Sequence, residues 1–433
     1  MQELKCSRVR HAMPNLGKSF TTLSLVTVLA TGAMAASLEE RVAALESQNE
    51  TLTEEVLATQ TGGFTKVDTE QSYNGLGAAA SKVYYSQTPL SIGGYGEMYY
   101  ANPEGSDDYA NVYRFVTYFG YKFSDNVILN AEIEYEHGAN AEEGGEVVIE
   151  FMYLDFLLRE EVNLRLGHVL VPMGIIGLRH EPTLFNTVQR PEVENKLIPT
   201  TWHENGALAY GKFSELGIEY TVGVINALNV NNEETTNAGS GWIRDGRQGA
   251  AKKASFDPAF VGRVDYVGLA GLTLGASVYY GGGSNLKDGN DKDGNFVGDI
   301  SGLTTTMFDI HAMYNNGAFK AYGLYTQTSL DGAEKISDTA IEKASGYYVN
   351  ASYNVASLTS LEYKIPLFVQ YENYNPVQST ADGLNEDKYK TEKTTIGLNF
   401  FPVDQAVIKV DYAMKTVNDI DDNIFSVGLG FIF

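Results

Sequence analysis

The sequence predicts an all-β protein: a 16-stranded antiparallel transmembrane β-barrel that follows a short N-terminal coiled-coil helix. Three observations lead to this fold class. From residue 89 to residue 433 the chain divides into short segments in which apolar and polar side chains alternate, as in strands with two different faces. Tight turns and long loops alternate between these segments, as they do in outer-membrane barrels. No apolar run is long enough for a transmembrane helix, although 43% of the residues are hydrophobic.

Residues 1–35 have the pattern of a secretory signal peptide. Basic residues precede the apolar segment FTTLSLVTVLA, which leads to the small-residue cleavage pattern Ala33-Met34-Ala35. The apolar segment is about ten residues long, too short to cross a bilayer. The region also contains Cys6, the single cysteine of the chain, and four basic residues against one acidic residue. Its removal leaves a chain without cysteine and takes the net charge from -24 to -27, which excludes nucleic acid as a partner.

Residues 36–60 show about three heptad repeats, which predict a periplasmic coiled coil. The seam alternates between Leu and Val, with one polar residue that fixes the register: Leu38, Val42, Leu45, Asn49, Leu52 and Val56. A coiled coil of this length is marginally stable alone, so we expect the rest of the chain to hold it together. Residues 61–88 are rich in Gly, Ser, Thr and Ala and have no period, which predicts a flexible linker.

The strands that follow have one apolar and one polar face. In VILNAEIEYE (127–136) the odd positions are apolar or small, and the even positions from Asn130 onward are polar. A water-soluble β-sandwich shows the same alternation, so the lengths of the connections decide between the two folds. Tight turns such as SDN near 124 and NNG near 315 alternate with long acidic or Gly-rich loops such as 227–256 and 282–301. This asymmetry between the two rims favours a barrel in the outer membrane of a Gram-negative bacterium.

The ends of the predicted strands carry many aromatic residues, including Tyr99-Tyr100 and Phe400-Phe401. Such residues form girdles at the two interfaces of a membrane, where lipid and lipopolysaccharide would be the neighbours. An even number of strands returns the chain to the rim at which the barrel begins. We therefore expect both termini on the periplasmic side, together with the coiled coil.

The third long loop, residues 172–204, contains four prolines and charges of both signs. A barrel of 16 strands encloses an aqueous lumen, and a loop folded inward would narrow it. The prolines Pro172, Pro182, Pro191 and Pro199 stiffen the loop because each one fixes a backbone dihedral. The candidate constriction residues are Arg179, His180, Glu181, Arg190, Glu192, Glu194, Lys196, His203 and Glu204. A ring of such charges would set the electrostatic potential across the pore.

Side chains at odd and even positions of a strand lie on opposite faces, and we call this alternation the strand parity. It places charged residues of both signs on the side that faces the lumen. The candidate lumen residues are Arg114, Lys122, Glu132, Glu134, Arg165, Arg263, Asp265, Lys364, Lys409 and Asp411. The parity of EVVIEFMYLDFLL stays open, because Glu150 and Asp155 would lie on opposite faces of a regular strand.

Two adjacent stretches resemble a known family. EVVIEFMYLDFLLREEVNLRLGHVLVPMG, followed by RHEPTLFNTVQRPEVENKLIPTTWHENG, is similar to the phosphate-selective porin O/P family in the broad sense, which includes relatives with an N-terminal coiled coil. The resemblance implies a homotrimeric outer-membrane diffusion channel. The coiled-coil seam of residues 36–60 differs from this expectation, because Val and Leu at its positions by rule favour a bundle of two helices. Phosphate-selective members have a dense ladder of arginines and lysines, but this lumen is mixed in sign. We therefore expect a porin for small hydrophilic solutes and ions, with anions or organic acids as candidates.

Two other classes of function stay open as alternatives. An outer-membrane enzyme is disfavoured because the chain has neither a Gly-x-Ser-x-Gly elbow nor a His-Glu-x-x-His motif. His180, Glu181, His203 and Glu204 could hold a metal ion, but hydrogen bonds from the loop to the wall are the favoured role, so we expect no metal and no cofactor. A structural outer-membrane anchor or adhesin is disfavoured because the N-terminal helix is short.

Overall fold

The computed structural model describes residues 42, 45–49, 66–230, 242–249, 257–282, 302–383 and 387–433. The chain divides into two units, residues 1–60 and residues 61–433. In the first unit residues 42 and 45–49 are helical, and the seam side chains Val42 and Leu45 are exposed. Leu38, Leu52 and Val56 lie outside the described residues, as does the predicted signal peptide. The predicted coiled coil and its partner helices therefore stay a prediction.

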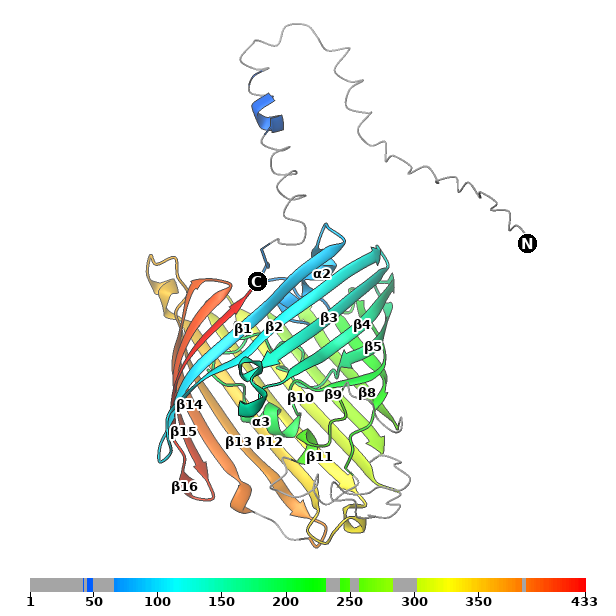
Figure 1. The fold of residues 1–433 in the computed structure, drawn as a ribbon, viewed down its shortest axis with the longest axis vertical. Helices are drawn as coiled ribbons and strands as arrows, with labels where there is room; N and C mark the ends of the chain where they lie inside the picture. Colours follow the sequence, from blue (N-terminus) through cyan, green and yellow to red (C-terminus); the bar gives the residue numbers. More distant parts are fainter. Residues whose placement is uncertain are drawn as a thin grey trace, which may run out of the picture. The chain divides into compact units, whose positions relative to one another are not determined.

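The second unit is an antiparallel β-barrel (Figure 1). Its strands are β1 Leu90–Pro103, β2 Tyr109–Ser124, β3 Val127–Glu136, β4 Val147–Arg159, β5 Val162–Leu170, β6 His203–Phe213, β7 Ile218–Asn226, β8 Pro258–Leu269, β9 Leu272–Gly282, β10 Thr304–Asn316, β11 Phe319–Asp331, β12 Ile341–Asn354, β13 Pro366–Thr380, β14 Thr391–Val403, β15 Ala406–Val417, β16 Ile420–Asp421 and β17 Ile424–Ile432. The helices of this unit are α2 Ala78–Tyr85, α3 Glu192–Leu197 and the 3-10 turns η1 His137–Ala139, η2 Ala141–Glu143, η3 Trp242–Arg244, η4 Ala333–Lys335, η5 Val355–Leu358 and η6 Asp387–Tyr389. Among the described helices, none combines the length and the apolar character that a membrane crossing needs.

Pairing between the first and last long strands closes the barrel. β1 and β17 are antiparallel neighbours from Tyr95, opposite Ile432, to Pro103, opposite Ile424. The two-residue strand β16 pairs only with β15, which also pairs with β17, so β16 is an extension of that hairpin. The closed barrel therefore has 16 strands, and the predicted fold class is confirmed. β1 begins and β17 ends at the rim where α2 lies, opposite the rim that carries β16 (Figure 1).

Side-chain burial separates the two faces of the barrel wall. In β10 the side chain of Ile310 is 56% exposed on the outside, whereas its neighbour Asp309 is fully buried inside. In β12 Val349 and Asn350 show the same contrast. The wall is apolar outside and polar inside, the reverse of a soluble domain, and hydrocarbon around the barrel would cover the apolar face.

A β-bulge in β4 resolves the parity that the sequence leaves open. The register between β3 and β4 changes between the pairs Glu132–Phe151 and Ile133–Ile149, so Glu150 is the extra residue of β4. A bulge turns the side chains that follow it to the other face. Glu150 and Asp155 are therefore both buried inside the barrel.

Helix α2 departs from the predicted flexible linker. Residues 78–85 are helical, and Ala78 to Val83 are buried. The helix lies close to β1 and β2, where glycines leave space for it: a Cβ atom on Gly93 would approach the carbonyl of Ala79, and one on Gly120 would collide with Val83. The small residues of this segment thus serve close packing against the wall rather than flexibility.

Candidate pore constriction

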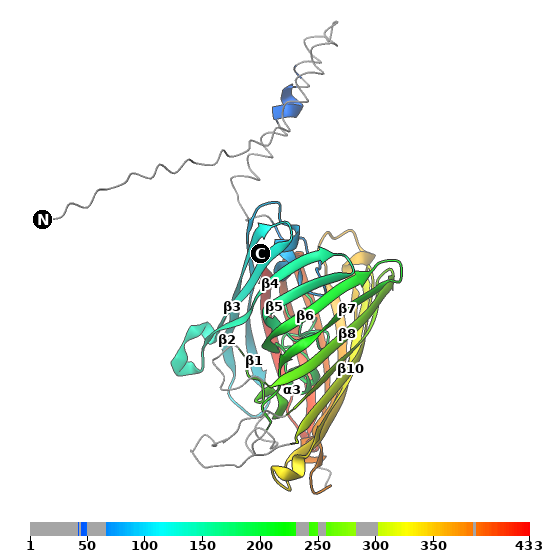
Figure 2. The ribbon, with the colours of Figure 1, turned by 90° about the vertical axis from the view of Figure 1, so that its right-hand side faces the viewer.

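The connection between β5 and β6, residues 171–202, lies inside the barrel and is almost entirely buried. Its short helix α3 lies within the ring of strands in both views (Figures 1 and 2). Pro191 immediately precedes α3 at its N-cap position, with the restricted φ angle of −52° that suits the start of a helix. We call residues 171–202 the constriction loop.

Helix α3 is fixed to the wall formed by β13, β14 and β15. The carboxylate of Glu192 accepts a hydrogen bond from the Tyr374 hydroxyl at 2.6 Å, and it lies 2.9 Å from Nζ of Lys393 and 3.5 Å from Nζ of Lys415. Burial by itself raises the pKa of Glu192, but the two ammonium groups outweigh it and hold the pKa well below its ordinary value. Glu192 is therefore ionised and forms a buried ion-pair network with the wall.

Strand β15 holds the preceding part of the loop. Nζ of Lys409 donates to the carbonyl oxygens of Phe185 and Thr187, each at 2.9 Å. Oδ2 of Asp411 accepts from the backbone N–H of Val188 at 2.6 Å. These two wall residues, which parity places in the lumen, thus satisfy backbone groups of the constriction loop instead of facing open water.

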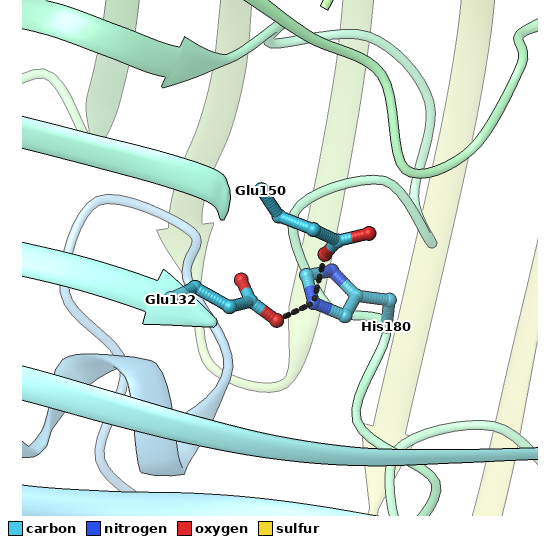
Figure 3. Close-up of side chains that lie close together, drawn as sticks. All are labelled: Glu132, Glu150 and His180. Carbon is cyan, nitrogen blue, oxygen red and sulfur yellow. Dashed lines mark hydrogen bonds and ion pairs between the residues drawn. The ribbon is translucent and has the colours of Figure 1, made fainter. Parts of the chain in front are cut away.

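On the opposite side of the barrel the loop contacts β3 and β4 through His180 (Figure 3). Nε2 of His180 lies 3.2 Å from Oε1 of Glu132 and 3.7 Å from Oε2 of Glu150, and Nδ1 lies 3.0 Å from the carbonyl oxygen of Gly177. The hydroxyl of Thr201 donates to the other oxygen of Glu150. Burial lowers the pKa of His180, because a charged imidazole is poorly solvated there.

The loop also caps helix α2. Oε1 of Glu181 accepts the backbone N–H groups of Ala79 at 2.9 Å and Ala80 at 3.0 Å. These N–H groups have no partner within the first turn of a helix, and the helix dipole favours a negative charge at this end. Glu181 therefore couples the position of α2 to that of the constriction loop.

Glu194 organises the interior of the loop itself. Its Oε2 accepts the backbone N–H groups of Ile175 at 3.0 Å and Ile176 at 2.8 Å, and its Oε1 accepts the Tyr348 hydroxyl at 2.5 Å. Burial raises the pKa of Glu194 to about 7, although these hydrogen bonds oppose the shift. The carboxyl group thus changes its charge near neutral pH.

We predict that Glu194→Gln removes a pH dependence of stability. Because the folded-state pKa of about 7 lies above the ordinary value, the contribution of Glu194 is complete at acidic pH and is lost as the pH rises through 7. The uncharged amide reproduces the protonated state, so the wild type should lose more stability than the variant between pH 5 and pH 8, by up to about 3 kcal/mol. Urea unfolding in detergent at both pH values measures this difference, and equal losses in the two proteins would contradict it.

The remaining candidates from the sequence do not form one cluster. Nδ1 of His203 faces Nε2 of His168 at 2.6 Å, and Glu204 accepts from the indole of Trp202 at 3.2 Å. The structure therefore does not assemble His180, Glu181, His203 and Glu204 into a metal site. Lys196 lies over the ring of Tyr374 at 5.9 Å.

Most charged candidates on the wall are paired with a group of opposite charge. Arg114 bridges Glu97 at 2.8 Å and Glu134 at 3.0 Å. Further pairs are Arg165 with Asp155 at 2.8 Å, Arg263 with Asp265 at 2.6 Å and Lys364 with Asp404 at 2.9 Å. Lys122 instead donates to the carbonyl oxygens of Tyr84 and Ser86 at the end of α2.

Two arginines that the sequence analysis missed also reach the constriction. Arg244 and Arg247 belong to the connection after β7, where Trp242 and Ile243 are buried. Arg244 donates to Oδ1 of Asn195 at 2.8 Å, and Arg247 donates to the carbonyl oxygen of Thr201 at 3.2 Å. The available signal was the motif GWIRDGR (241–247), which places two apolar residues and two arginines in an otherwise polar loop.

Four arginines at the constriction carry positive charge without a paired carboxylate. Among the described residues, Arg179, Arg190, Arg244 and Arg247 have no acidic group within 4.0 Å that forms an ion pair. Burial lowers the pKa of Arg247 to about 10, so the guanidinium still carries its charge at neutral pH. Among the described residues, these four arginines are therefore positive charges of the constriction that no carboxylate neutralises at ion-pair distance.

A cavity of about 920 Å³ lies between the constriction loop and the rim near α2. Its lining includes Arg179 and Asn186 from the loop, Lys320 and Lys364 from the wall, and Glu70. Turn residues 269–272 and 315–318 border it, which places the cavity at the rim of tight turns. This side of the constriction thus has room for small solutes and their hydration water.

Comparisons with known proteins agree with this geometry. Residues 95–424 match the family model described as "Phosphate-selective porin O and P". An uncharacterized protein of Aquifex aeolicus (strain VF5) is 33% identical over 380 residues, which cover 83% of this chain and 84% of that protein.

Solved structures with the same fold are more distant in sequence. OmpF of Salmonella typhi, in complex with daunomycin, has a TM-score of 0.54 at 12% identity and covers 79% of this chain and 97% of its own. An anion-selective porin from Comamonas acidovorans has a TM-score of 0.52 at 15% identity, over 79% of this chain and 99% of that chain. The outer membrane channel DcaP of Acinetobacter baumannii has a TM-score of 0.50 at 13% identity, over 79% of this chain and 97% of that chain. At these identities the likeness concerns the fold alone.

Proposed function

The chain belongs to the phosphate-selective porin O and P family and is an outer-membrane β-barrel porin, and we propose that it conducts small hydrophilic solutes with a preference for anions. The observation that supports this preference most directly is the set of unpaired arginines at the constriction, Arg179, Arg190, Arg244 and Arg247. Fixed positive charge in a narrow aqueous path attracts anions and repels cations.

The pairing of the wall charges supports a broad anion preference over a dedicated phosphate path. Arg114, Arg165 and Arg263 are each neutralised by a carboxylate at 3.0 Å or less. They therefore do not add to a continuous ladder of free cationic groups. Organic acids, whose carboxylates suit the planar donor fork of arginine, are the solute class that we propose.

Planar-bilayer recordings test the proposal. The wild type should show a reversal potential of the anion-selective sign under a salt gradient, and a dicarboxylate should reduce the chloride current at least as strongly as phosphate does. We predict that Arg244→Gln with Arg247→Gln lowers the permeability of anions and raises that of cations by about threefold each per charge, the effect of ~0.7 kcal/mol from a charge ~6 Å away in water.

Two matched variants separate charge from structure. Arg244→Lys with Arg247→Lys keeps both charges and should keep the selectivity of the wild type. Arg159→Gln with Lys212→Gln removes two positive charges at exposed positions outside the constriction and should change little. A cation-selective wild type would contradict the proposal. So would equal shifts of the permeability ratio in the Arg244→Gln/Arg247→Gln variant and in the Arg159→Gln/Lys212→Gln variant.

We also propose that residues 1–35 are removed as a signal peptide and that residues 36–60 join three chains on the periplasmic side. The helical state and the exposure of Val42 and Leu45 support an apolar seam that a single chain leaves uncovered. β1 and β17 both meet the rim near α2, which supports placing both termini on one side of the membrane.

A further inference from the structure

The contact between His180, Glu132 and Glu150 has an unusual arrangement of hydrogen-bonding groups (Figure 3). A carbonyl oxygen can only accept, so the Nδ1 atom of His180, 3.0 Å from the Gly177 carbonyl, carries the proton. In a neutral ring the lone pair of Nε2 then points at the carboxylate oxygens of Glu132 and Glu150. The ring nitrogen and two carboxyl groups therefore converge on one point, where a bound cation or a proton must lie between them.

The charges around this point are also unbalanced. Glu97, Glu132, Glu134 and Glu150 are all at most 8% exposed, and Arg114 forms ion pairs with Glu97 and Glu134 but not with Glu132 or Glu150. Glu132 and Glu150 have no ion-pair partner among the described residues other than His180. Oε2 of Glu132 and Oε2 of Glu150 have no hydrogen-bond partner among the described residues. A buried carboxylate oxygen without a partner is uncommon, and a bound ion is one of the groups that can satisfy it.

We propose that Glu132, Glu150 and His180 bind one divalent transition-metal ion, with Zn²⁺ as the best match. The ligand atoms lie within 4.8 Å of one another, and all three residues are buried. Tetrahedral Zn²⁺ with bonds of about 2.0–2.1 Å separates its ligands by about 3.4 Å. The distances from Nε2 of His180 to the two carboxylates are 3.2 Å and 3.7 Å, on either side of that value.

Groups behind the ligands hold them in this orientation. The Gly177 carbonyl fixes the ring of His180, and the Thr201 hydroxyl binds the oxygen of Glu150 that faces away from Nε2. Such outer contacts orient the ligands of metal sites in proteins. The β4 bulge at Glu150 contributes as well, because it turns that carboxylate into the barrel beside Glu132.

A second histidine in the barrel shows the contrasting case. The ring nitrogens of His311 lie 2.6 Å from Asp309 and 2.8 Å from Asp265, and the guanidinium of Arg263 lies 2.8 Å from Nε2. Arg263 supplies the positive charge that these two carboxylates require. At His180, no cationic side chain among the described residues lies within ion-pair distance of Glu132 or Glu150 apart from the histidine itself.

The metal ion would tie the constriction loop to β3 and β4. Because the ligands are buried, the ion would enter as the barrel folds and exchange slowly afterwards. It would hold the loop on one side of the barrel, while the Glu192 network holds it on the other.

Metal content of the full-length protein tests the proposal. Protein folded with Zn²⁺ and desalted into metal-free buffer should contain about one Zn²⁺ per chain by mass spectrometry, and Glu132→Gln or Glu150→Gln should reduce this below about a tenth. Glu204→Gln, which changes a nearby buried carboxylate outside the cluster, should keep the metal. Heat-modifiable migration in electrophoresis shows that each variant has folded.

A spectroscopic measurement on the wild type removes the dependence on variants. Protein folded with Co²⁺ should show the intense visible absorption of tetrahedral cobalt with nitrogen and oxygen ligands. Less than about a tenth of an equivalent of Zn²⁺ in the wild type would overturn the proposal. Zn²⁺ retained in both glutamine variants, or a weak octahedral Co²⁺ spectrum, would overturn it equally.

Discussion

Glu192→Ala should release the constriction loop from the β13–β15 side of the barrel. Glu192 is the common partner of the Tyr374 hydroxyl, Lys393 and Lys415, and its removal leaves Lys393 buried without that carboxylate at 2.9 Å. Breaking a buried ion pair by removing one partner costs about 3–5 kcal/mol. Lys393 also lies 3.8 Å from Glu372, and Lys415 also pairs with Asp422, so we expect the lower end of this range. Single-channel recordings should show a larger mean conductance and more frequent transitions between conductance levels.

Two variants serve as controls for the loss of this anchor. Glu392→Ala removes a carboxylate that pairs with Lys390 at an exposed surface, where ion pairs contribute little, so its conductance should equal that of the wild type. Glu192→Gln keeps the oxygen that accepts from Tyr374, so its conductance should lie between those of Glu392→Ala and Glu192→Ala. Since the pKa of Glu192 is lowered, the anchor should persist at neutral pH and weaken only as the pH falls below the ordinary carboxyl range. An unchanged conductance in Glu192→Ala would show that the loop does not depend on this network.

The barrel was predictable because its signal is local and repeats along the chain. Strands such as β15 alternate with a period of two residues, and hydrocarbon outside and polar groups inside impose that period on every strand. The β4 bulge was not predictable, because one extra residue shifts the period without any change in composition. Helix α2 was missed for another reason: its Ala-rich sequence suits a linker, and only the glycines of β1 and β2 reveal that it packs.

The candidate site was predictable in composition but not in its contacts. The prolines and the mixed charges of residues 172–204 identified a distinctive loop, but Glu192 and its partner Lys393 are 201 positions apart. Parity assigned Lys409 and Asp411 to the lumen, yet it could not show that they bind loop backbone rather than water. Arg244 and Arg247 were missed because their loop has no regular period, and its inward position depends on the burial of Trp242 and Ile243.

Ile310→Arg should hinder insertion of the barrel into a bilayer, since it places a charge on the face that hydrocarbon would cover. Ile310 is at the centre of β10, 56% exposed on the outer face, with Ala276 and Tyr325 as its neighbours in the adjacent strands. An arginine on the lipid-facing side near the bilayer midplane costs about 2–4 kcal/mol, and less near the interfaces. Folding into lipid vesicles, followed by heat-modifiable migration and urea titration, measures this cost.

Leu358→Arg provides the matched control for this substitution. Leu358 is 73% exposed and ends η5, which lies between β12 and β13 rather than within a strand. The same charge introduced there should change the free energy of unfolding by less than about 1 kcal/mol, because water can solvate it. Hydrocarbon around the strands is the reason for which we expect the two arginines to differ by this amount. Equal effects at both positions would therefore contradict the membrane-facing assignment of β10, whatever the channel conducts.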